Sequence, residues 1–147
     1  MLEPDKHKIY TAIANSEMST AAKEATQRLF EFSLQNADEL KIGTGDSPSF
    51  LYQIWTPEGS KTLFLCNPSS GYGSIQLSNF GRRFPAPLPS ARDFRQFKDA
   101  LLKQQGFGSL KRSHSYPGFE VSKTLVLPKV EEAFQKAVLR FQRSFMG

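Results

Sequence analysis

The chain has 147 residues, of which 39% are hydrophobic and 22% charged, and its formal net charge at pH 7 is +5. This length and composition exclude a disordered chain and predict one globular domain, residues 1–147. The chain has no run of 18 apolar residues, and its N-terminus is polar, which excludes a membrane-spanning helix and a signal peptide. We therefore expect a cytoplasmic protein with no membrane contact.

The first part of the chain has helical periodicity. Apolar residues three and four apart predict a short helix over Asp5–Asn15 and a stronger one over Ser19–Asn36. Ser19 or Thr20 is the expected N-cap, because a hydroxyl can accept from the unpaired N–H groups of the first turn. Glu24 and Arg28 are spaced for an i,i+4 ion pair on the solvated face.

From residue 38 the apolar residues alternate, which indicates β-strands. The expected strands are Glu39 to Ile42, Ser49 to Thr56, Thr62 to Asn67 and Ser74 to Ser78. Turns of a few Gly, Pro and Ser residues separate them, which is typical of an antiparallel meander. Cys66 is the only cysteine, so it can form no internal disulfide, and its apolar neighbours predict a buried filler rather than a nucleophile.

The second half of the chain alternates helices with irregular segments. Residues 79–89 contain three prolines and are expected to form a loop, followed by a helix that Ser90 caps and Gly106 ends. Residues 107–119 have no period, residues 124–127 predict a short strand, and Pro128 opens the last helix. The order predicts an α+β domain: a small antiparallel meander of about four strands, covered by helices at the N- and C-terminal ends.

The charge is uneven along the chain. Residues 1–80 contain six Lys/Arg and nine Asp/Glu, whereas residues 81–147 contain thirteen and five. A basic half favours an anionic partner, and DNA or RNA is the first candidate, because cations contact phosphates and aromatic rings stack on unpaired bases. The residues expected to bind nucleic acid are Arg82, Arg83, Lys111, Arg112, His114, Tyr116, Arg140 and Arg143.

Other functions remain as alternatives. The basic half would also fit an acidic partner protein, in which case an apolar patch should lie beside the cations. An enzyme with a site in the 107–119 loop would use His114, but no carboxylate can be assigned to orient that imidazole, so we favour a protein without catalytic activity. No cofactor or metal is expected, since two histidines and one cysteine offer no zinc-ligand spacing.

Two short motifs are better explained as structure than as sites. Glu39-Leu40-Lys41 has the spacing of a nuclease strand, but the second acidic residue would have to be Asp5, which precedes a helix. Gly43-Thr44-Gly45-Asp46 follows a strand as a phosphate loop does, yet it lacks the Lys-Ser/Thr pair and the following helix. We interpret these segments as a solvated strand edge and a hairpin turn.

The order of segments along the chain is itself informative. It runs from a helix to a strand ending in a Gly-rich turn, then through SFLYQIW, LFLCNP and GSIQLSNF to a late YPGF loop before the final helix. This order resembles a class of small α+β domains of unknown function, found alone or appended to restriction- or defence-type nucleases. The resemblance covers roughly Ile9 to Phe145. It implies an accessory or binding role for a domain without an active site of its own, and it carries over no functional residues.

Overall fold

The computed structural model of the chain describes residues 3–43, 48–57, 59–68, 73–77, 91–104, 106–107 and 118–145. The helices in these ranges are α1 (Glu3–Asn15), α2 (Thr20–Asn36), α4 (Ala91–Leu102) and α5 (Pro128–Arg143), with one 3₁₀ turn, η2 (Val121–Lys123). The strands are β1 (Glu39–Gly43), β2 (Ser49–Thr56), β3 (Gly59–Asn67), β4 (Ser74–Leu77) and β5 (Gly118–Glu120). None of these helices has the length and apolar character that crossing a membrane requires.

The five strands form one antiparallel sheet in the order β1-β2-β3-β4-β5. Strands β1 to β4 are the predicted meander, and the α+β class is confirmed. The strand expected at residues 124–127 is wrong. That segment is a turn, in which the Thr124 N–H donates to the Val121 carbonyl and the Thr124 hydroxyl to the Glu120 carbonyl. Leu125 is buried in this turn, and a short apolar run of this kind cannot be distinguished from a strand by periodicity.

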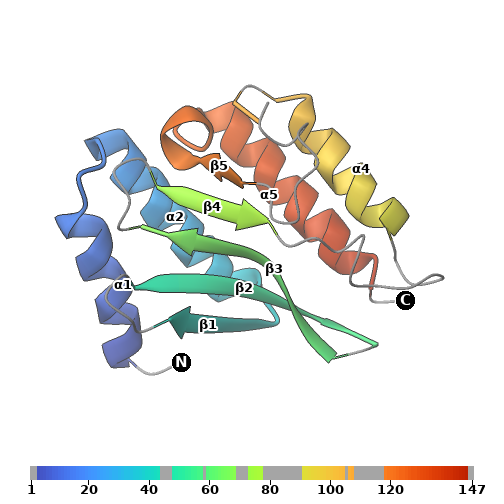
Figure 1. Cartoon of the computed structure of the whole chain (residues 1–147), viewed down its shortest axis with the longest axis horizontal. Helices are drawn as coiled ribbons and strands as arrows, with labels where there is room; N and C mark the ends of the chain where they lie inside the picture. The colour runs from blue at the N-terminus through green and yellow to red at the C-terminus, as the bar shows by residue number, and fades with distance from the viewer. Residues whose placement is uncertain are drawn as a thin grey trace.

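Helices α2 and α5 lie against the same face of the sheet, α1 packs on α2, and α4 packs on α5 (Figure 1). Aromatic pairs join the layers. The rings of Phe30 in α2 and Phe50 in β2 have centroids 5.1 Å apart, and those of Phe134 in α5 and Phe64 in β3 are 5.6 Å apart. All four rings are fully buried and belong to one core between the sheet and these two helices.

A β-bulge shapes the centre of the sheet. The register between β2 and β3 shifts at Tyr52 and Gln53, because Tyr52 pairs with Phe64 and Gln53 pairs with Thr62. Leu63 is therefore an extra residue without a partner on β2, and both it and Phe64 are fully buried. Beyond the bulge, β2 and β3 continue past the end of β1 as a two-stranded arm (Figure 1).

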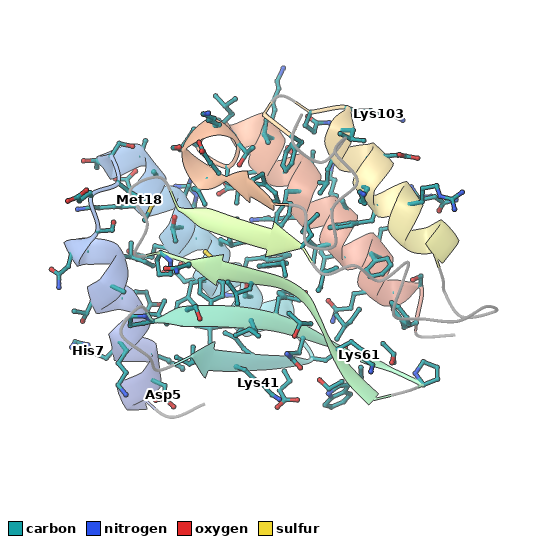
Figure 2. The ribbon with its side chains drawn as sticks, in the orientation of Figure 1. Asp5, His7, Met18, Lys41, Lys61 and Lys103 are labelled. Atoms are coloured by element: carbon teal, nitrogen blue, oxygen red, sulfur yellow. The ribbon has the colours of Figure 1, made fainter. Side chains whose placement is uncertain are left out.

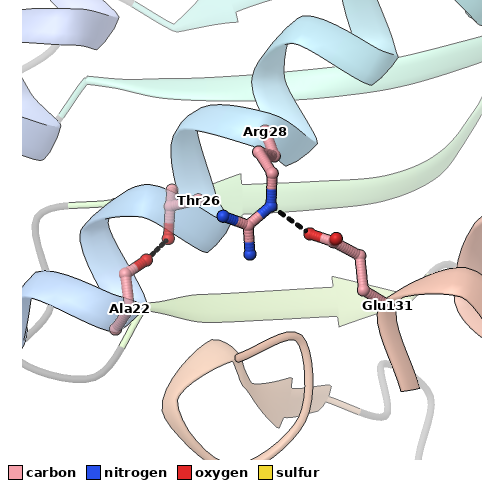
Figure 3. Close-up of polar contacts among 4 residues, drawn as sticks. All are labelled: Ala22, Thr26, Arg28 and Glu131. Atoms are coloured by element: carbon pink, nitrogen blue, oxygen red, sulfur yellow. Dashed lines mark hydrogen bonds and ion pairs between the residues drawn. The ribbon is translucent and has the colours of Figure 1, made fainter. Parts of the chain in front are cut away.

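Helices α2 and α5 are also joined by an ion pair (Figure 3). The Arg28 Nε–H donates to Glu131 Oε2 at 2.8 Å, and the two side chains are 46% and 18% exposed. The expected pairing of Arg28 with Glu24 is therefore wrong. The partner is 103 positions away in the sequence, and only the packing of the two helices on one sheet face brings it within reach.

Candidate functional site

Of the eight residues predicted to bind nucleic acid, the structure describes Arg140 and Arg143. The other six, Arg82, Arg83, Lys111, Arg112, His114 and Tyr116, lie outside the described residues. Arg140 and Arg143 both occupy the last turn of α5, three residues apart, and their side chains are exposed. Residues at this spacing lie on the same side of a helix, so the two guanidinium groups belong to one surface.

These two arginines have no carboxylate partner among the described residues. Lys136, one turn earlier on α5, forms an ion pair with Glu132 at 2.8 Å. At the C-terminal end of a helix a cation is favoured by the partial negative charge of the helix dipole, which explains why arginine is stable there. A guanidinium that no carboxylate neutralises can still donate several hydrogen bonds to an anionic ligand.

A groove runs beside Arg140, between the antiparallel helices α4 and α5. Its volume is about 210 Å³, and it is lined by Gln96, Phe97 and Ala100 from α4 and by Ala137, Arg140, Phe141 and Ser144 from α5. The floor is apolar: the rings of Phe97 and Phe141 are 5.6 Å apart, and each residue is only 3% exposed. Arg140 is the charged residue on the rim, so the groove offers an apolar floor next to a cation.

The helical spacing of Phe97 and Phe141 with neighbouring apolar residues can be read from the sequence, and it places each ring in the apolar face of its helix. Nothing in the sequence says that the two faces meet, so the groove could not be predicted. Ala100 and Ala137 could have indicated a groove, because small residues at the edges of two apolar faces leave space when the helices pack.

A hydrogen-bonded network, buried at Tyr52 and Gln142 and exposed at Asp38, fixes the end of α5 that carries the arginines. The Tyr52 hydroxyl donates to Gln142 Oε1 at 2.5 Å, and Gln142 Nε2 donates to the Asn36 carbonyl at 2.9 Å and to Asp38 Oδ1 at 3.1 Å. Asp38 Oδ2 in turn accepts from the Trp55 backbone N–H at 2.8 Å. The network ties α5 to the end of α2 and to β2, so Arg140 and Arg143 project from a rigid position.

The network and the core also make the fold sensitive to alkaline pH. Burial, and then the negative charge of Asp38, raise the pKa of Tyr52, and burial raises the pKa of the Cys66 thiol. Both groups stay neutral in the folded protein, whereas in the unfolded chain they ionise near pH 10 and roughly pH 8.5. Stability is therefore complete below these values and is lost as pH rises, because the unfolded state releases protons that the folded state retains.

We expect the free energy of unfolding, measured by urea titration between pH 8 and 10.5, to fall with rising pH. Each group contributes a slope of up to about 1.4 kcal/mol per pH unit above its unfolded pKa. Cys66→Ala should remove the part of the decline that starts at roughly pH 8.5, and Tyr52→Phe should remove the part that starts near pH 10. A decline unchanged in both variants would mean that other groups cause it.

The motifs interpreted as structure are found as such. Asp5 lies in α1 and not on a strand next to Glu39, so the two do not form a nuclease-like pair of strand carboxylates. Gly43 pairs with Ser49 across the antiparallel strands β1 and β2, and Thr44, Gly45 and Asp46 of the predicted hairpin turn lie outside the described residues. Cys66 is fully buried in β3, which confirms it as a core residue. Within the described ranges, no three His, Cys, Asp or Glu side chains gather at one point.

Comparison with known proteins identifies no relative of this chain. No protein-family model, no curated protein and no solved structure matches this chain.

Proposed function

We propose that the protein is a non-catalytic module that binds nucleic acid, with the C-terminal end of α5 as part of the binding surface. The observation that carries the proposal is the pair Arg140 and Arg143, exposed on one side of a helix and without a carboxylate partner among the described residues. Over residues 95–102 of α4 and 128–143 of α5 there are six Lys/Arg and three Asp/Glu, and this net positive charge favours contact with a phosphate backbone.

Phosphate contacts of this kind give affinity without sequence readout. Such a role agrees with the accessory function implied by the resemblance to domains appended to nucleases. We propose the cytoplasm as the compartment, since the lone thiol of Cys66 suits a reducing environment. The enzyme alternative rests on His114, which lies outside the described residues, and it stays a prediction.

The test is the affinity of a fluorescein-labelled single-stranded 20-mer, measured by anisotropy between 50 and 200 mM NaCl. We expect binding by the unaltered protein to weaken steeply with salt, and Arg140→Ala/Arg143→Ala to lower the steepness of log K against log[salt] by about 1.4, the value for two lost contacts to a single strand. The matched control, Lys8→Ala/Lys41→Ala, removes the same charge from α1 and β1. Equal loss in both double variants, or no binding at 50 mM salt, would refute the α5 surface.

A second candidate is an acidic partner protein, and the groove beside Arg140 favours it. An apolar floor next to a cation suits an acidic helix that inserts a leucine. Ala100→Leu separates the two functions, because it fills the groove and leaves both arginines in place. If the variant retains the 20-mer affinity but loses binding of a peptide with Glu on one helical face and Leu on the other, the groove is a protein-binding site.

A further inference from the structure

The chain contains one tryptophan, and its side chain is on the surface. Trp55 is 63% exposed and lies near the end of β2, on the arm that β2 and β3 form beyond β1. It pairs with Ser60 across the arm. A largely exposed tryptophan is uncommon, because burying the large indole ring removes much apolar surface from water. Tryptophan is also enriched at the hot spots of protein-binding surfaces.

The backbone of Trp55 is held in place. Strand β1 begins at Glu39, opposite Gln53, so it supplies no partner for Trp55. Instead, Asp38 Oδ2 accepts the Trp55 N–H at 2.8 Å, and the other oxygen of the same carboxylate accepts from Gln142 of α5. The indole is therefore presented from a fixed backbone, which lowers the entropy that binding costs.

Among the described residues, Gln53, Ser60 and Thr62 near Trp55 satisfy one another's hydrogen bonds, whereas Glu39 does not take full part. Gln53 donates to Thr62 and accepts from the Ser60 hydroxyl at 2.9 Å. Ser60 Oγ is also 3.4 Å from Glu39 Oε2, but its single proton goes to the nearer oxygen of Gln53. The exposed Glu39 carboxylate thus reaches the residue directly opposite Trp55 and retains its capacity to accept hydrogen bonds.

The charges around the indole favour a cation. Asp38 and Glu39 are both exposed carboxylates, and the face of an indole ring is itself electronegative. Lys41 lies further along β1, two residues from Glu39, and Lys61 lies on the arm (Figure 2). Lys61 pairs with Ile54, whose side chain is fully buried, so Lys61 lies on the opposite face of the arm from Trp55. An arginine or lysine side chain over the ring would gain both a cation–π contact and an ion pair with Glu39.

We propose that Trp55 and Glu39 form a docking site for a partner protein, which inserts an arginine or lysine from a basic segment. The site lies on the sheet and its arm, and it uses none of the residues of the α4–α5 surface. Its partner carries positive charge, the opposite of the anionic partner proposed for Arg140 and Arg143. The two proposals therefore stand or fall separately.

The intrinsic fluorescence of the full chain tests this site directly, because Trp55 is the only tryptophan. We expect the peptide (Gly-Ser-Arg)₄ to change Trp55 emission with a saturable dependence on concentration, and (Gly-Ser-Glu)₄ to leave it unchanged. By anisotropy of the labelled arginine peptide, Trp55→Ala should weaken binding roughly fivefold and Glu39→Gln roughly threefold. Lys41→Gln is the matched control, and it should bind the peptide as well as or better than the unaltered protein.

Three outcomes would overturn the proposal. The first is no change in emission with the arginine peptide, or the same change with the glutamate peptide. The second is unchanged affinity in Glu39→Gln. In the third, a single-stranded oligonucleotide changes Trp55 emission and Lys41→Gln weakens that effect, which would assign the indole to base stacking. Arg140→Ala/Arg143→Ala should leave the peptide titration unaltered, so failure of the nucleic-acid proposal cannot be mistaken for failure of this one.

Discussion

Replacing Phe134 by alanine is expected to lower the free energy of unfolding by about 3–5 kcal/mol. Phe134 is fully buried in α5, and its ring lies 5.6 Å from the ring of Phe64 in β3 and 5.6 Å from that of Phe119 in β5. Truncation would remove the contacts that attach α5 to two strands at once. The cavity cannot close easily, because both neighbours are held by the sheet.

Urea denaturation followed by far-UV circular dichroism measures this loss. Phe134→Leu keeps most of the volume and should cost about 1.5 kcal/mol or less, so it gives a reading even if the alanine variant does not fold. Lys136→Ala, which breaks the exposed pair with Glu132, is the control on the same helix and should change stability by less than about 0.5 kcal/mol. A loss below 1 kcal/mol for Phe134→Ala would contradict the packing described for α5.

Gly106→Ala is expected to have a comparable effect for a different reason. Gly106 has φ +92°, a conformation that side chains rarely adopt. A Cβ added there would be 2.3 Å from the Lys123 carbonyl oxygen and 2.8 Å from Thr124 Cγ2. Backbone strain and overlap together should cost about 2–5 kcal/mol, because the overlapping oxygen belongs to the backbone of the η2 turn and cannot rotate away.

Gly59 is the matched control for this prediction. It also has positive φ, +110°, but nothing lies within 4 Å of a Cβ added to it. Gly59→Ala should therefore show the conformational cost alone, about 1–2 kcal/mol, and the difference between the two variants isolates the overlap with Lys123. Equal decreases in melting temperature for Gly59→Ala and Gly106→Ala would show that the overlap with Lys123 does not contribute to the loss of stability.

The elements that could be predicted from the sequence are those with strong local signals. Helix α2 has its cap as expected, since Ser19 Oγ accepts the Ala22 N–H at 3.2 Å. The meander followed from alternation and Gly/Pro/Ser turns. Helix α4 ends at Leu102, four residues before the expected stop at Gly106. Gly106 is required instead by its contact with the η2 turn, which is a tertiary feature and leaves no local signal.

The candidate site was predictable in part. Arg140 and Arg143 were identified because the charge pattern of one helix is a local property. The groove beside them, the network of Tyr52, Gln142 and Asp38, and the exposure of Trp55 all depend on which elements meet. Trp55 follows the fully buried Ile54 in β2, so its side chain points to the opposite face of the sheet from the one that the helices cover, and β1 begins short of it, at Glu39.

The dependence of the sheet on α5 also bears on the order in which the chain folds during synthesis. Strands β1 to β4 pair with their neighbours in sequence, so their contacts are local and form early. The rings of Phe64 and Phe119, however, are covered by Phe134, which is synthesised later than either strand. A growing chain is therefore expected to pass through a stage in which paired strands expose the part of their apolar face that α5 later covers. Docking of α5 ends that stage, and a chain interrupted before Pro128 would retain an exposed apolar surface that is prone to aggregation.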